Sequence, residues 1–171
     1  AALSYGTKSI SKVDKIVGPG GAFVTLAKSL VNDHTGIDML AGPTELGIIA
    51  DNSVDPEFLA LDLISQAEHS GDTFCYLITN SEKTAKLVNQ IVSKLLPTIQ
   101  RKELVKSSLS KNGFIAVCKN SSDMVNLANS LAPEHLQIMT KNPKLISSKI
   151  TTAGLVLLGD YSPSSASDYI L

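Results

Sequence analysis

The chain has 171 residues, 43% of them hydrophobic, and a formal net charge of -1 at pH 7. This composition excludes a disordered chain and allows one sizeable core or two small lobes. Without an excess of basic residues, binding to nucleic acid or to a membrane surface is not expected. No apolar run is long enough to span a bilayer, and both cysteines, Cys75 and Cys118, lie in apolar runs. We therefore expect a cytoplasmic protein with buried, reduced thiols.

Apolar runs alternate with helical patterns along the chain. Strands are expected at residues 14–18, 46–51, 74–79, 113–118, 136–140 and 154–158, and helices at 22–32, 55 to about 69, 81 to about 97, and 121–132. Asp55 and Ser81 are the expected N-caps, and Pro97 is expected to break its helix. The strands are continuous apolar runs, which is typical of burial on both faces of a parallel sheet. The sequence predicts an α/β fold, a Rossmann-like layered sheet of mostly parallel strands with helices on both faces.

A glycine loop, GPGGAF at 18–23, follows the first expected strand and opens the first long helix. Backbone N–H groups of such a loop can approach an anion at the helix N-terminus. The spacing is not GxGxxG, because Phe23 stands where the last glycine would be. Taken alone, the loop is as well explained by a tight turn.

The helix ending in QAEH carries Asp62, Gln66 and His69 at positions i, i+4 and i+7, which places them on one stripe. A solvent-facing stripe is the simplest interpretation. An amide oxygen and an imidazole three residues apart can also bind one divalent metal, and imidazole suits zinc.

The stretch APEHL places Glu134 and His135 just before a strand. Adjacent side chains in extended backbone point opposite ways, so the pair could serve as general acid and base, or could be two exposed residues in a proline loop. AGPTE at 41–45 and QAEH also precede strands. In a parallel sheet the three stretches would gather at one edge, which favours a shared site.

Together VDKIVGPGGAFVTLAK, GIDMLAGPTELGIIAD, DLISQAEH, LAPEHLQI and SPSSASDY resemble the histidinol dehydrogenases, in collinear order along nearly the whole chain. The resemblance implies oxidation of L-histidinol to L-histidinaldehyde and then to L-histidine, with two NAD and one zinc per site, in a homodimer. It implies that Gln66, His69 and Asp168 bind zinc and substrate, that Thr44 and His135 contact substrate, and that Gly20 and Gly21 belong to the NAD site. His135 would take the proton in the first oxidation, and Glu134 would help to activate water for the second.

The chain departs from the family pattern at several points. Gly21 stands where the family has Asn, Thr44 stands where it has Ser, and no His follows His135. Family members are also longer at both ends. We expect the central portion of such an enzyme, with residues 1–44 as the end of a nucleotide-binding lobe and 45–171 as most of a second lobe carrying the metal and catalytic residues. Alone, it is expected to be inactive.

Two alternatives remain open: a non-catalytic binding or assembly protein that keeps the fold, and a zinc-dependent dehydrogenase acting on another amino alcohol. The chain order also makes a geometric prediction. Asp168 follows strand 154–158, whereas Gln66 and His69 precede a strand. If the last strand ran antiparallel to its neighbour, its end would arrive beside His69 directly.

Overall fold

The computed structural model describes residues 1–18, 20–38, 40 and 44–166, and the chain divides into two compact units, Ala1–Pro43 and Thr44–Leu171. The roles expected for residues 1–44 and 45–171 stay a prediction.

The first unit is a small βαβ arrangement. Its elements are α1 (Ala2–Tyr5), β1 (Lys15–Ile16), α2 (Ala22–Val31) and β2 (Gly36–Ile37). Strands β1 and β2 pair in parallel, with Ile16 opposite Ile37. The expected strand 14–18 is therefore only two residues long, and β2 was not expected because two residues carry no periodic signal.

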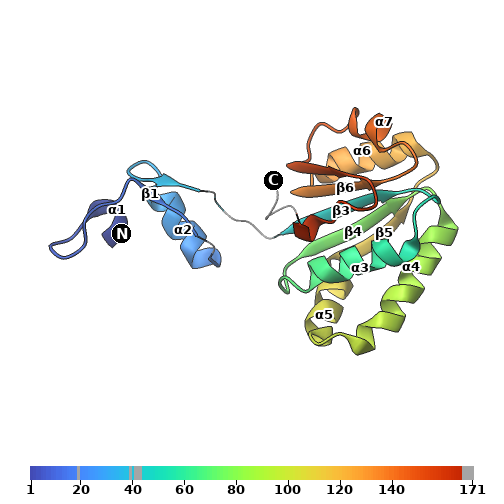
Figure 1. Cartoon of the computed structure of the whole chain (residues 1–171), viewed down its shortest axis with the longest axis horizontal. Coiled ribbons are helices and arrows are strands. Elements are labelled where there is room, and N and C mark those ends of the chain that lie inside the picture. The colour runs from blue at the N-terminus through green and yellow to red at the C-terminus, as the bar shows by residue number, and fades with distance from the viewer. Residues whose placement is uncertain (19, 39, 41–43, 167–171) are drawn as a thin grey trace. The chain divides into compact units, whose positions relative to one another are not determined.

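The second unit is a five-stranded sheet in the order β5-β4-β3-β6-β7, with every pairing parallel (Figure 1). Its strands are β3 (Glu45–Ala50), β4 (Phe74–Thr79), β5 (Gly113–Val117), β6 (His135–Met139) and β7 (Leu155–Leu158). Its helices are α3 (Pro56–Ala67), α4 (Glu82–Leu95), a 3-10 turn (Leu96–Thr98), α5 (Lys102–Asn112), α6 (Ser121–Leu131) and α7 (Pro143–Ser147). The expected α/β fold is confirmed.

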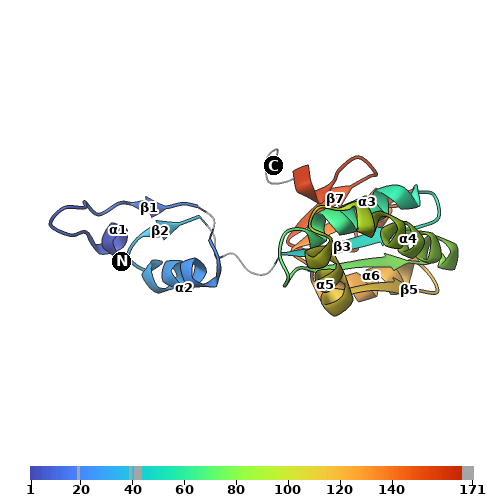
Figure 2. The same cartoon turned by 90° about the horizontal axis from the view of Figure 1, so that it is seen from below.

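Helices cover both faces of this sheet (Figure 2). One core cluster joins Leu46, Ile48 and Leu77 to helices α3, α4 and α5. The other joins Ile49, Ile78 and their neighbours to α6 and α7. Strands buried on both faces explain why the sequence shows continuous apolar runs.

The expected helix signals are confirmed. The Asp55 carboxylate accepts the backbone N–H of Glu57 at 2.9 Å, and the Ser81 hydroxyl accepts that of Thr84 at 3.1 Å. Helix α4 ends at Leu95, and Pro97 lies in the 3-10 turn that follows. Each cap satisfies a backbone donor that the helix cannot satisfy internally.

The expectation of an antiparallel last strand is wrong. Strand β7 runs parallel to β6, with Leu155 opposite His135. Helix α7 lies in the crossover between the two strands, and such a crossover returns the chain to the starting edge of the sheet. The chain doubles back only after β7. The Tyr161 ring lies 5.9 Å from that of Phe58 in the first turn of α3, and Ser164 reaches Gln66 in its last turn. Asp168 lies outside the described residues.

Candidate functional site

The starts of the parallel strands bring the candidate site residues to one edge of the sheet, as expected from the chain order. His135 opens β6 and lies opposite Leu46 of β3. The carbonyl of Thr44, just before β3, accepts the backbone N–H of Phe74 at the start of β4 at 3.1 Å. Helix α3 returns the chain to this edge, so Gln66 and His69 arrive at the same edge as Thr44 and His135.

The approach to β6 is held in an unusual backbone conformation. Helix α6 ends at Leu131, and its C-cap residue, Ala132, has a φ of 49° and a ψ of 55°, in the left-handed region. For a non-glycine residue this costs about 1–2 kcal/mol. Gly154, just before β7, packs closely against the backbone of Glu134. A Cβ on Gly154 would lie only 2.8 Å from the Glu134 carbonyl oxygen. The neighbouring strand thus fixes the backbone that carries Glu134.

Glu134 and His135 form a close pair. The Glu134 Oε2 lies 3.6 Å from His135 Nδ1, and the side chains are 37% and 13% exposed. At that distance the Nδ1 atom is not hydrogen-bonded, and it has no other partner among the described residues. A partly buried imidazole beside a carboxylate is an arrangement that suits a general base.

Glu45 is a member of the site that the sequence did not single out. Its backbone N–H donates to Glu134 Oε2 at 3.3 Å, and its own Oε2 accepts the Glu134 N–H at 3.4 Å. The two glutamates therefore brace the starts of β3 and β6 against each other. Burial, with the negative charge of Glu45, raises the pKa of the fully buried Tyr76 phenol. The only sequence signal was the position of Glu45 beside Thr44.

The polar stripe of α3 is not a solvent-facing stripe. Gln66 is buried, and its Oε1 accepts the Ser164 hydroxyl at 3.4 Å. Asp62 Oδ2 accepts the Nε2 of Gln137, a fully buried side chain of β6, at 2.7 Å. Only His69 at the end of the stripe is exposed. The stripe thus faces the sheet on the same side as His135.

Gln66 and His69 suit zinc as an amide oxygen and an imidazole, and they lie within one turn of each other at the site edge. The third candidate ligand, Asp168, lies outside the described residues. Within the described part of the chain, no group of three His, Cys, Asp or Glu side chains could hold a metal. The two described donors are therefore compatible with a metal but do not make a closed site by themselves.

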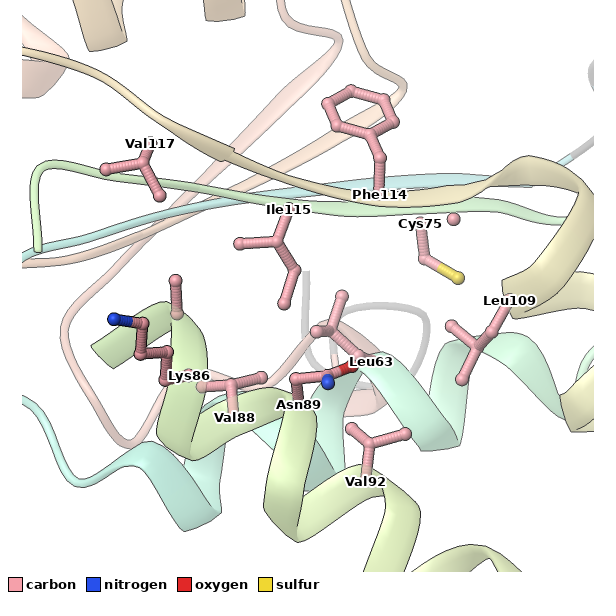
Figure 3. Close-up of a pocket in the computed structure, with 12 residues that line it drawn as sticks. Leu63, Cys75, Lys86, Val88, Asn89, Val92, Leu109, Phe114, Ile115 and Val117 are labelled. Carbon is pink, nitrogen blue, oxygen red and sulfur yellow. The ribbon is translucent and has the colours of Figure 1, made fainter. Parts of the chain in front are cut away.

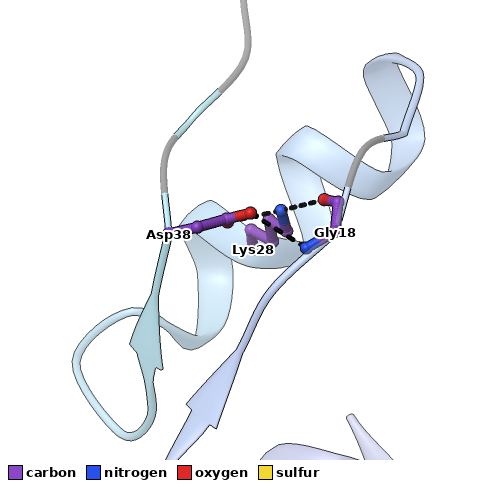
Figure 4. Close-up of polar contacts among 3 residues, drawn as sticks. All are labelled: Gly18, Lys28 and Asp38. Carbon is purple, nitrogen blue, oxygen red and sulfur yellow. Dashed lines mark hydrogen bonds and ion pairs between the residues drawn. The ribbon is translucent and has the colours of Figure 1, made fainter. Parts of the chain in front are cut away.

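The glycine loop of the first unit is held by a buried lysine. Lys28 Nζ donates to the Gly18 carbonyl oxygen, and also to Asp38 Oδ1 at 2.6 Å (Figure 4). The other carboxylate oxygen, Asp38 Oδ2, accepts the backbone N–H of Gly18 at 2.9 Å. Gly18 has a φ of 141°, which favours glycine. Gly20 and Gly21 follow, and Gly21 is the N-cap of α2. The loop geometry is compatible with anion binding, which stays a prediction.

Comparison with known proteins decides the family. The histidinol dehydrogenase family model matches residues 1–171. The chain belongs to the histidinol dehydrogenase family. It is 45% identical over 169 residues to the histidinol dehydrogenase of Oceanobacillus iheyensis, covering 99% of this chain and 40% of that protein. It is 44% identical over 170 residues to that of Aquifex aeolicus, again covering 99% of this chain and 40% of the relative. The chain thus spans about 40% of the length of these relatives.

A solved structure agrees. The crystal structure of histidinol dehydrogenase from Elizabethkingia anophelis superposes with a TM-score of 0.91 at 39% identity, covering 98% of this chain and 39% of that one. A propionaldehyde dehydrogenase from Clostridium phytofermentans superposes with a TM-score of 0.62 at 15% identity, covering 98% of this chain and 50% of that one. At that identity the second likeness shows the fold alone.

Other features of this family member lie away from the site. A pocket of about 430 Å³ lies between α4 and the edge strand β5, with walls that include Val88, Phe114 and Ile115 (Figure 3). Burial raises the pKa of the Cys75 thiol, one wall of the pocket, to about 11. Cys75 and Cys118 are free thiols, the first buried and the second half-buried. No helix among the described residues is long and apolar enough to cross a membrane.

Proposed function

We propose that this chain carries the catalytic pair of an NAD- and zinc-dependent histidinol dehydrogenase, which oxidises L-histidinol to L-histidine in two steps. The observation that carries the proposal is the placement of His135 and Glu134 at the strand-start edge that Gln66 and Thr44 also reach. Family membership supports the same reaction. We further propose a cytoplasmic homodimer as the working form.

The first role falls to His135. Alcohol oxidation removes a proton from the hydroxyl and a hydride from the carbon. His135 would accept that proton on its other ring nitrogen, because its Nδ1 is buried and faces Glu134 Oε2 at 3.6 Å. NAD, when bound, would accept the hydride.

The second role falls to Glu134. Oxidation of an aldehyde to an acid requires addition of water before the second hydride can leave. The Glu134 side chain is 37% exposed, so a water molecule can reach it, and the backbone N–H of Glu45 donates to its carboxylate. It would therefore orient and deprotonate that water.

Gln66, His69 and Asp168 would hold the zinc, and Thr44 would contact substrate. Zinc, when bound, would orient the substrate nitrogen and oxygen atoms, because it has no redox chemistry of its own. In the first unit, Gly20 and Gly21 would approach NAD at the N-terminus of α2.

The test is a chimera in which the 171 residues replace the matching segment of the Oceanobacillus iheyensis relative. We expect NADH formation on L-histidinol, and a loss of about 10²–10⁴-fold in kcat for His135→Ala. Glu134→Gln should impair oxidation of the aldehyde more than oxidation of the alcohol. A folded chimera without turnover on L-histidinol, or with turnover only on another amino alcohol, would contradict the proposal.

A further inference from the structure

The middle of β6 carries a polar side chain, Gln137, between the apolar residues Leu136 and Ile138. Gln137 is fully buried, and its Nε2 donates to Asp62 Oδ2 of α3 at 2.7 Å. Its Oε1 has no hydrogen-bond partner within the described part of the chain. A polar pair with a fully buried member is often no more stabilising than an apolar pair of similar volume. Stability alone therefore does not account for it.

The pair lies at a fixed offset from the site. Asp62 precedes Gln66 by four residues on α3, which is about 6 Å along a helix. Gln137 follows His135 by two residues on β6, which is about 6.6 Å along a strand. Because α3 returns the chain to the edge where the strands start, helix and strand run in opposite directions. A bond between Asp62 and Gln137 thus brings Gln66 level with His135.

We propose that Asp62 and Gln137 are positioning residues of the site: their partly buried hydrogen bond sets how far α3 can slide along β6, and so holds Gln66 level with His135. Buried apolar residues of α3 such as Leu59 and Leu63 also pack against the sheet. Apolar contacts are non-directional and tolerate small shifts, whereas a hydrogen bond demands a narrow range of distance and angle. The chemical role of the two positioned residues rests on the proposed function, but their placement does not.

The experiment measures the position of the two residues in the chain itself, without turnover. The main variant is Asp62→Leu with Gln137→Met, which replaces the polar pair by an apolar one. Asp62→Asn is the conservative variant, because its amide oxygen can still accept from Gln137. Asp51→Asn is the matched control. The Asp51 carboxylate accepts the backbone N–H of Lys141, linking β3 to the end of β6 at the opposite edge.

Two readouts are recorded by NMR, with the free energy of unfolding measured alongside. They are the side-chain signals of Gln66 and His135, and the amide exchange of the last turn of α3 relative to its first turn. In the apolar double variant we expect both side-chain signals to shift and the last turn to exchange at least about tenfold faster, without a matching loss of stability. In the Asp62→Asn variant both readouts should match those of the unmodified chain, because the hydrogen bond from Gln137 is kept. The Asp51→Asn control should also leave both readouts unchanged.

Unchanged signals in the folded double variant would overturn the proposal. If the double variant does not fold, Gln137→Met alone decides in the same way, since half-exposed Asp62 can then be solvated. Failure of the proposed function looks different: the readouts would respond as expected while the chimera fails to oxidise L-histidinol.

Discussion

At the scale of single residues, the reciprocal hydrogen bonds between Glu45 and Glu134 hold the candidate catalytic residues Glu134 and His135 in place. Glu45→Ala removes the acceptor for the Glu134 N–H, whereas Glu45→Gln keeps an oxygen there. In the chimera we expect the alanine variant to lower kcat by about tenfold, equivalent to about 1.4 kcal/mol. The glutamine variant should retain most of the activity. Equal losses in the two variants would instead indicate that the charge of Glu45 matters.

The glycine loop allows a second test at this scale. A Cβ on Gly21 would meet no atom within 4 Å, and its φ of -74° suits any residue. Asn is a better N-cap than Gly, so Gly21→Asn should stabilise the chain by a few tenths of a kcal/mol. A Cβ on Gly20 would lie 2.4 Å from that of Val24, so Gly20→Ala should destabilise it by about 1–3 kcal/mol. Urea unfolding measures both, and a destabilising Gly21→Asn would contradict the cap.

At the scale of elements, the contact between α3 and β6 gives a pH dependence. Burial raises the pKa of Asp62, and the hydrogen bond from Gln137 only partly offsets it. The native state therefore binds the Asp62 proton more tightly than the unfolded chain, whose Asp titrates near pH 3.9. Protonation of Asp62 therefore stabilises the fold. This contribution to the free energy of unfolding is complete below about pH 4 and is lost as the pH rises through the raised pKa of native Asp62.

We therefore expect Asp62→Asn, which removes the buried charge, to stabilise the chain at neutral pH. The gain should shrink at about pH 3.5, where the wild-type carboxyl is largely protonated. Urea unfolding at the two pH values measures this. A gain of equal size at both would show that the carboxylate charge is not the cause.

Elements set by local signals were predictable, and those set by non-local pairing were not. The caps at Asp55 and Ser81 and the buried strands follow from neighbouring residues and from apolar runs. The direction of β7 depends on the crossover through α7, which carries only a weak local pattern. The Asp62–Gln137 bond joins residues 75 positions apart, and no periodicity in a single sequence marks such a pair. The position of the candidate site was nevertheless predictable. Its residues precede expected strands, and the starts of parallel strands lie at one edge of the sheet.

At the scale of the whole molecule, the first unit exposes much apolar surface. Exposed apolar side chains on α2 include Phe23 at 90%, Leu26 at 58% and Leu30 at 71%. Their spacing of three and four residues places them on one face of the helix. A contiguous apolar face of this kind favours association, because covering it removes apolar area from water.

We therefore expect the chain to form dimers or larger assemblies in solution. Light scattering over a range of protein concentrations measures the mass. Replacing Phe23 and Leu30 by Ser should shift the population toward monomer, since both side chains leave the exposed face without loss of a buried contact. Ser in place of exposed Leu145, on α7 of the second unit and 61% exposed, is the matched control and should leave the mass unchanged. A wild-type chain that stays monomeric at high concentration would contradict association through α2, and an equal shift in the control would place the contact elsewhere.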